Sequence, residues 1–349
     1  MNKLIRKKNM NRREFNKLLT VASLGSPLFL RSSSKGSESK SVTDDLIHRN
    51  ERPTMTYCKL GRTNYMSSKL VFGAGAALRE GKSVRLLERS FEAGINHYDT
   101  GFEDSYKGSE ESLAPFLARH KQEIWVASKA ALRIENKPGE AVTLDQIKSA
   151  AKSWVINLDK SLKNLKTDYI DAYYLMMLNN PEIVQREELY NTFLEAKSAG
   201  KVGFFGLSTH ENAEKVLEAA IATGWYDIVT PGITPAGWYD WNTKELAKDT
   251  PKLTELKPLF KKAKQAGIGL VGMKTARYIA PMDSLGKGDP NAFDPIYDDA
   301  FTRADLNPYQ RAIVFVLEHG LDVVVSDMQN FEHLEDNIVA CANSHKYFG

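Results

Sequence analysis

The stretch AGINHYDTGFEDSYKGSEESLAPFLARHKQEIWVASKA, residues 93–130, contains two short apolar runs separated by an amphipathic segment. The apolar runs end at Asp99 and Lys129 and have the length of buried β-strands, whereas the segment between them has helical character. A helix that returns the chain to begin another strand produces a parallel βαβ unit. The stretch therefore predicts a parallel sheet with helices on its outer side.

The same alternation continues along the chain. Between the apolar runs lie amphipathic segments such as Leu144–Leu165, where apolar residues recur at three- and four-residue steps along one helical face. Eight such units over roughly 280 residues match one (β/α)₈ TIM barrel, and nothing marks a second domain within them. The predicted strands are Leu70–Phe72, Asn96–Asp99, Trp125–Ser128, Ile170–Leu175, Val202–Ser208, Ile228–Thr230, Gly269–Met273 and Asp322–Val325.

Three segments depart from the βα pattern. Residues Thr56–Leu70 contain GRTN at 61–64 between two extended pieces, which predicts an N-terminal β-hairpin. The segments Pro231–Pro258 and Ala280–Asn307 are long and follow strand ends, so we expect them at the C-terminal face of the barrel. Loops there favour a substrate-lining role, with Trp238 as a candidate contact, although aromatic residues can also anchor their own loop.

The N-terminal segment has a different character from the barrel. NRREFNK, at residues 11–17, resembles a twin-arginine export signal, and the apolar stretch Leu18–Leu30 is too short to span a bilayer. We expect an export signal at 1–35, a linker at 36–55 and the barrel at 56–349. The expected localisation is the periplasm of a bacterium, reached through the twin-arginine export machinery. No clear cleavage site follows, so membrane anchoring and a disordered basic tail stay open.

Charge separates the same two parts. The chain carries a net charge of +3, but residues 1–35 hold nine of its 47 Lys and Arg and one of its 44 Asp and Glu. The remainder, with 38 basic and 43 acidic residues, has a charge of −5. A mildly acidic barrel offers no footprint for nucleic acid, and no Cys/His cluster indicates a metal. Cys58 and Cys341 are the two cysteines, and whether they pair after export stays open.

Three polar residues lie where predicted strands end: Asp99, Tyr106 in the loop that follows it, and Lys129. In a barrel of parallel strands, catalytic groups gather at these ends. A phenol is a poor acid at neutral pH, but an ammonium beside it favours the phenolate, and a carboxylate keeps a desolvated ammonium charged. We therefore predict a proton-transfer site with Tyr106 as general acid/base. A purely structural Asp99–Lys129 ion pair is the alternative.

Several blocks of sequence, in order from about residue 56 to 342, resemble the aldo-keto reductase family. The resemblance implies the same barrel and an NAD(P)-dependent oxidoreductase that acts on a carbonyl or alcohol, with small carbonyl or sugar-like substrates. Nothing in it argues against a monomer. The blocks are GRTNYMSSKLVFGAG, AGINHYDTG followed by GSEESLAPFL, SLKNLKTDYIDAYYL, AGKVGFFGLSTH, IGLVGMKT and DVVVSDMQNFEHLEDNI.

The resemblance also implies a nicotinamide cofactor across the barrel mouth. The segment Ser326–Asn337, matched to its adenine end, has no Arg or Lys that would select a 2′-phosphate, so NAD is as compatible as NADP. Lys274 or Arg277 could still reach a phosphate. The positions assigned to the cofactor are Gly73 and Ala74 near the ring or ribose, Ser208 near the carboxamide, and Lys274, Arg277, Ser326 and Asn337.

One departure from the family concerns the substrate carbonyl. Met176 stands where the family usually has a polarising histidine, and a thioether cannot donate a hydrogen bond to an alkoxide. Losing such a donor typically costs about 10²–10³ in rate. His210, two residues beyond Ser208, could face the pocket instead, or be a partly exposed loop residue.

The spacing from Asp99 to Tyr106 is also two residues longer than usual in the family. Together with the missing histidine, this keeps two other functions open. One is a non-catalytic barrel that binds a nucleotide or another ligand. The other is a redox-neutral enzyme, an epimerase or lyase acting on sugars, that retains its nicotinamide.

Overall fold

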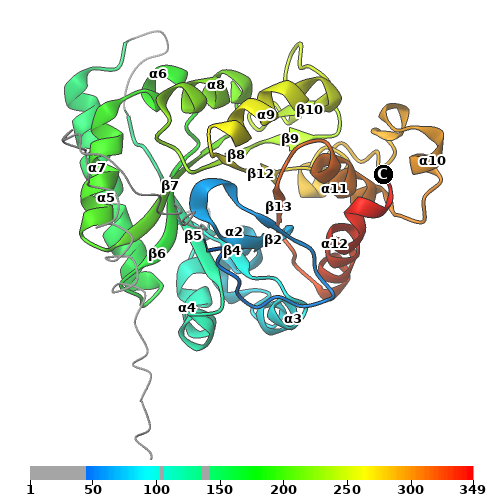
Figure 1. Cartoon of the computed structure of the whole chain (residues 1–349), viewed down its shortest axis with the longest axis horizontal. Helices are drawn as coiled ribbons and strands as arrows, with labels where there is room; N and C mark the ends of the chain where they lie inside the picture. Colours follow the sequence, from blue (N-terminus) through cyan, green and yellow to red (C-terminus); the bar gives the residue numbers. More distant parts are fainter. Residues whose placement is uncertain (1–44, 103–105, 135–140, 349) are drawn as a thin grey trace, which may run out of the picture. The chain divides into compact units, whose positions relative to one another are not determined.

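Eight parallel strands close into a barrel in the order β12-β13-β3-β4-β5-β6-β7-β8 (Figure 1). The computed structural model describes residues 45–102, 106–134 and 141–348. All eight predicted strands are confirmed, with ends that differ by at most three residues. They are β3 (Leu70–Gly73), β4 (His97–Asp99), β5 (Trp125–Ala131), β6 (Ile170–Met176), β7 (Val202–Thr209), β8 (Ile228–Pro231), β12 (Gly269–Met273) and β13 (Val323–Ser326).

Helices cover the outside of the barrel (Figure 1). The predicted helix at 144–165 is α5, which begins after a capping box made by Thr143 and Gln146. Its apolar face includes Trp154, whose indole N–H donates to the carbonyl of Tyr174 at 3.2 Å. The α-helices of the described residues are α2 (Ala74–Ala77), α3 (Leu86–Glu92), α4 (Ser109–His120), α5 (Leu144–Asn164), α6 (Pro181–Val184), α7 (Glu187–Ser198), α8 (Ala213–Thr223), α9 (Lys257–Gln265), α10 (Asp299–Thr302), α11 (Pro308–Glu318) and α12 (Phe331–Asn343).

Alternation along the strands divides the apolar residues into two clusters. The larger cluster fills the layer between the strands and the helices. The smaller one fills the barrel interior, where the ring of Trp125 lies 4.8 Å from that of Tyr65 and 5.2 Å from that of Phe204. On β5 the inward positions include Trp125, Ala127 and then Lys129, so a charged side chain follows the apolar ones toward the C-terminal end of this strand.

The predicted hairpin consists of β1 (Tyr57–Lys59) and β2 (Met66–Ser68) in antiparallel register. Leu60 and Tyr65, between the strands, belong to the interior cluster. Gly61 has a φ of +53°, and a Cβ there would overlap the backbone of Gly269 at the start of β12. The hairpin therefore closes the barrel at the N-terminal ends of its strands.

Cys58 and Cys341 are both free thiols, so the disulfide that the sequence left open is absent. Cys58 packs beside the interior cluster and its thiol donates to the carbonyl of Asp322 at 3.2 Å. Cys341 is fully buried in the outer cluster. The two side chains thus belong to different apolar layers although Thr56 bonds the carbonyl of Cys341 at 2.6 Å.

The expected export signal at 1–35 lies outside the described residues. Within the described part of the chain, no helix is long and apolar enough to cross a membrane. The contacts place Leu46–Gly349 in one compact unit.

Candidate active site

The ends of β4 and β5 carry a buried ion pair. The Lys129 ammonium donates to the carboxylate of Asp99 and, at 2.8 Å, to the carbonyl of Thr100. Burial by itself lowers the pKa of Lys129, but the negative charge of Asp99, with help from Tyr106, outweighs it and the pKa of Lys129 is raised. Lys129 is therefore an ammonium at neutral pH.

Tyr106 lies against this pair. Its ring centre is 5.6 Å from the Lys129 ammonium, and the residue is half-buried in the loop that leads to α4. The structure thus brings together the three residues that the sequence proposed for proton transfer, Asp99, Tyr106 and Lys129.

The ends of β6 and β7 form the neighbouring wall. Met176 is buried at the end of β6, and the hydroxyl of Ser208 accepts a hydrogen bond from the backbone N–H of Met177 at 3.2 Å. His210 is buried with 8% of its surface exposed, so it is no exposed loop residue. Burial, followed by the charges of nearby lysines including Lys129, lowers the pKa of His210 to about 3. Its imidazole is neutral at neutral pH.

The long segment after β8 contributes a different tryptophan from the one expected. It folds into β9 (Ile233–Thr234), β10 (Gly237–Asp240) and β11 (Glu245–Leu246). Trp238 is buried, donates its indole N–H to Glu214 on α8 at 3.0 Å and packs edge-on against Phe260 on α9. This corrects the expectation for Trp238, which anchors the segment. Trp241, from the same segment, lies nearer to the site, with its ring 6.0 Å from that of His210.

Two of the expected cofactor residues are bonded to each other, Ser326 at the end of β13 and Asn337 within α12. Asn337 donates to the hydroxyl of Ser326 at 2.9 Å. A Cβ on Gly73, at the end of β3, would lie 2.7 Å from the carbonyl oxygen of Ser326 and 2.9 Å from the Asp327 carboxylate. A side chain at position 73 would therefore not fit. Ala74 follows Gly73 as the first residue of α2.

Lys274 follows β12 and points its ammonium at the ring of Trp241, 4.0 Å from the ring centre. Within the described residues, no oxygen accepts a hydrogen bond from this ammonium. Its N–H donors are therefore available to bind an anion. Burial lowers the pKa of Lys274 to about 8 even though Asp327 opposes the shift. Arg277, three residues on, donates to the carbonyl of Ser284 at 2.7 Å.

Two residues near the site, Asp327 and Lys244, are functional candidates that were not predicted from the sequence. Asp327 follows the end of β13, and its charge acts on both Lys129 and Lys274. The rule that polar residues after strand ends face the mouth could have found it. Lys244, whose ammonium lies 3.2 Å from the ring centre of Trp241, has no such signal, because its position depends on how the segment after β8 folds.

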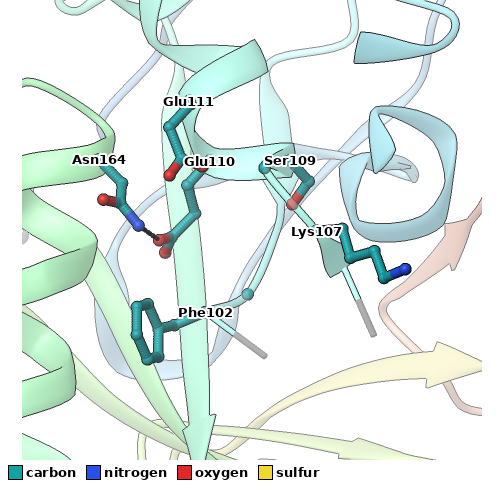
Figure 2. Close-up of a pocket in the computed structure, with 8 residues that line it drawn as sticks. Phe102, Lys107, Ser109, Glu110, Glu111 and Asn164 are labelled. Atoms are coloured by element: carbon teal, nitrogen blue, oxygen red, sulfur yellow. Dashed lines mark hydrogen bonds between the residues drawn. The ribbon is translucent and has the colours of Figure 1, made fainter. Parts of the chain in front are cut away.

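A cavity of about 330 Å³ lies beside the site between α4 and α5 (Figure 2). Glu110 in its wall is buried and accepts hydrogen bonds from Ser128 at 2.6 Å and Asn164 at 3.1 Å. Burial raises the pKa of Glu110. Both carboxylate oxygens already have partners, so this acid holds α4 against β5 and α5. The other lining residues are Gly101, Phe102, Lys107, Gly108, Ser109 and Glu111.

No group of three or more His, Cys, Asp or Glu side chains in the described ranges is arranged to hold a metal ion.

Comparison with known proteins places this geometry in context. The sequence profile described as "Aldo/keto reductase family" matches residues 69–277. The uncharacterized oxidoreductase YqkF of Bacillus subtilis is 29% identical over 152 residues, 43% of this chain and 48% of that protein. The L-glyceraldehyde 3-phosphate reductase of Escherichia coli K12 is 26% identical over 151 residues, 42% of each chain. The chain thus spans less than half the length of these relatives.

Solved structures show the same fold. A crystal structure of a Pseudomonas aeruginosa protein described as an aldo-keto reductase superposes with a TM-score of 0.57 and 19% identity, covering 85% of this chain and 99% of that one. At this identity the likeness concerns the barrel alone. The norsolorinic acid reductase of Emericella nidulans is more similar locally, with 32% identity over 125 residues, 35% of this chain and 32% of that protein.

Proposed function

This chain belongs to the aldo/keto reductase family, and on that premise we propose that it is an NAD(P)-dependent oxidoreductase acting on a carbonyl or alcohol substrate. One observation carries the proposal. The buried Lys129 ammonium bonds the Asp99 carboxylate and lies 5.6 Å from the ring centre of Tyr106. A phenol and an ammonium held together at strand ends are suited to moving a proton to or from a substrate oxygen.

In this proposal Tyr106 is the general acid/base. The phenol gives its proton to the carbonyl oxygen during reduction and takes it back during oxidation of an alcohol. The attraction between Tyr106 and Lys129 contributes to the raised pKa of Lys129, and the same attraction favours the phenolate over the phenol. Asp99 keeps the lysine charged, so its role is to position and to compensate charge.

His210 is the proposed replacement for the donor missing at Met176. A neutral imidazole carries one N–H donor and one acceptor nitrogen. The Nδ1 atom of His210 is buried and has no hydrogen-bond partner in the described part of the chain, so the ring is not committed to a structural bond through this atom. Proximity to Lys129 and Lys274, visible in its lowered pKa, supports a place at the mouth.

The residues at the mouth fit a nicotinamide nucleotide. Gly73 admits no side chain, Ser208 offers a buried hydroxyl, and the Lys274 ammonium has no acceptor among the described residues. We propose that these residues bind the cofactor together with Ala74, Ser326 and Asn337, and that Lys274 and Arg277 bind its phosphates. NADP and NAD both fit this set. When bound, the nicotinamide supplies or accepts hydride.

Substrate and location are part of the proposal. The relative in E. coli is named for reduction of a small phosphorylated aldehyde, and we propose a small carbonyl or sugar-like substrate here. We also propose that residues 1–35 direct the protein through the twin-arginine machinery to the periplasm, where a nicotinamide pool is lacking. A cofactor loaded before export would then be retained and regenerated in place.

Retention of a bound nicotinamide after export favours a second candidate function. Met176, buried where the family usually has its polarising histidine, points to a site rebuilt for another reaction. A redox-neutral epimerase or lyase acting on sugars needs no external nicotinamide, since it oxidises and re-reduces within one cycle. The corresponding non-catalytic alternative is a barrel that binds a nucleotide or another ligand without turning over a substrate.

The test replaces the proposed acid. Tyr106→Phe keeps the ring and removes the hydroxyl, so we expect turnover of simple aldehydes with NADPH or NADH to fall by about 10²–10⁴-fold, to a small residual rate, while the Kd for the nucleotide hardly changes. Tyr297→Phe is the matched control, because its buried hydroxyl has no partner in the described residues.

Full turnover in Tyr106→Phe would reject the acid/base role. Tight nucleotide binding without turnover across diverse carbonyls in the unmodified protein would favour the second candidate. The absorbance and mass of protein purified after export then show whether a nicotinamide stays bound.

A further inference from the structure

The ring of Tyr106 occupies a slot whose two walls are glycines. A Cβ added to Gly75 would lie 2.7 Å from one edge of the ring, and one added to Gly101 would lie 2.6 Å from the other edge. Contacts this short do not occur between a real Cβ and a ring carbon, so a side chain on either wall would displace the phenol.

Gly101 lies at the junction between the phenol and the lysine. Its added Cβ would also come within 3.1 Å of the Cγ atom of Lys129. The segment around it is fixed, because the N–H of Thr100 bonds the carbonyl of Ala127 and the N–H of Phe102 bonds that of Lys129, each at 2.9 Å. The backbone at Gly101 therefore cannot retreat, and Tyr106 would have to move.

Backbone conformation does not explain either glycine. Neither Gly75 nor Gly101 has a positive φ, so the residues are not needed for a left-handed turn. Gly75 lies within the short helix α2, where alanine is intrinsically better than glycine by about 1 kcal/mol. The space beside the ring is what these two positions provide.

We propose that Gly75 and Gly101 are positioning residues that hold the Tyr106 ring at the Lys129 ammonium. The slot fixes the phenol although the loop from Asp99 is two residues longer than the family usually has. The inference rests on the proposed acid/base role of Tyr106 for its catalytic consequence, but the placement of the ring stands independently of that role.

The experiment combines Gly101→Ala and Gly75→Ala with Tyr106→Phe in a double-mutant cycle. For each single glycine variant we expect kcat for DL-glyceraldehyde with NADPH to fall about 10- to 100-fold, because misplacing a reacting group by about 1 Å costs up to this much. The Kd for NADPH should stay within about twofold. In the Tyr106→Phe background the same methyl group should change residual turnover by less than about twofold.

Gly272→Ala is the control, since it adds a methyl to the barrel wall at 3.3 Å from Ile233 and away from Tyr106. It should leave kcat unchanged. An equal loss of turnover for Gly101→Ala in both backgrounds, or no loss in either, would overturn the positioning role.

A crystal structure of Gly101→Ala separates this inference from the proposed function. We expect the ring of Tyr106 to be displaced from Lys129. A ring that stays in place overturns the slot, whereas a displaced ring with full activity supports the slot and rejects the acid/base role of Tyr106.

Discussion

At the scale of single residues, Lys274 has a charge that depends on its surroundings. Its pKa of about 8 means that the ammonium is present below this pH and is lost as the pH rises through it. If the ammonium binds a cofactor phosphate, affinity for NAD(P)H should fall by about tenfold for each pH unit well above 8, because each unit removes about nine tenths of the remaining ammonium.

Fluorescence titration of NADPH from pH 6 to 10 measures this step, which begins near pH 8, the pKa of Lys274 in the free protein, and levels off above the higher pKa that the ammonium has beside a bound anion. Lys274→Arg keeps its charge over this range, so its affinity should be flat. A flat profile in the unmodified protein, or the same step in Lys274→Arg, contradicts the phosphate-binding role.

The positions of some site residues could be predicted from the sequence, whereas those of others could not. Asp99 and Lys129 were predictable, because both follow clear apolar runs of parallel strands, and parallel strands bring their C-terminal parts together. The orientation of His210 was not predictable, since it depends on where β7 ends and on the burial of a loop. Asp327 lies in the segment Ser326–Asn337, which the resemblance to the family matched to the adenine end of the cofactor and not to the lysines at the mouth.

At the scale of elements, strands and helices that bury one face were predicted well. β12 has the predicted bounds and α5 ends one residue before its predicted end, because burial imposes a period of two or of 3.6 on their sequence. The segment from Pro231 to Pro258 has no such period. Its three short strands are fixed by packing on α8 and α9, so the sequence could not show that Trp238, the predicted contact, is buried against these helices.

The anchoring role of Trp238 can be measured. Trp238→Phe keeps an aromatic ring against Phe260 but removes the hydrogen bond to the Glu214 carboxylate, so we expect a loss of about 1–3 kcal/mol in unfolding free energy. Urea unfolding followed by fluorescence provides the value. Turnover below the denaturation midpoint should be nearly unchanged.

Tyr239→Phe is the matched control, because its hydroxyl is buried without a partner in the described residues and its removal should cost little. A fall in turnover of Trp238→Phe without a loss of stability would return Trp238 to the substrate pocket.

At the scale of the whole molecule, the two thiols report on the fold. Burial and the charge of Asp322 raise the pKa of Cys58 to about 12, and burial raises the pKa of Cys341 further. Neither is a thiolate at neutral pH, so neither should react quickly with Ellman's reagent in the folded protein. In denaturant two thiols per chain should react, and Cys58→Ser should leave one. Exported protein with no reactive thiol and a mass lower by two hydrogens would contradict this prediction.

The described chain begins at the hairpin end of the barrel. Ile47 bonds the backbone around the hairpin, Arg49 donates to the carbonyl of Ile124 just before β5, and Asn50 donates to that of Phe91 at 2.8 Å. All of these contacts lie at the end opposite Tyr106. A bead or sensor chip coupled at Leu46 itself would therefore hold the barrel by the end that the hairpin closes, and the mouth would face the flowing solution with its access to diffusing substrate intact.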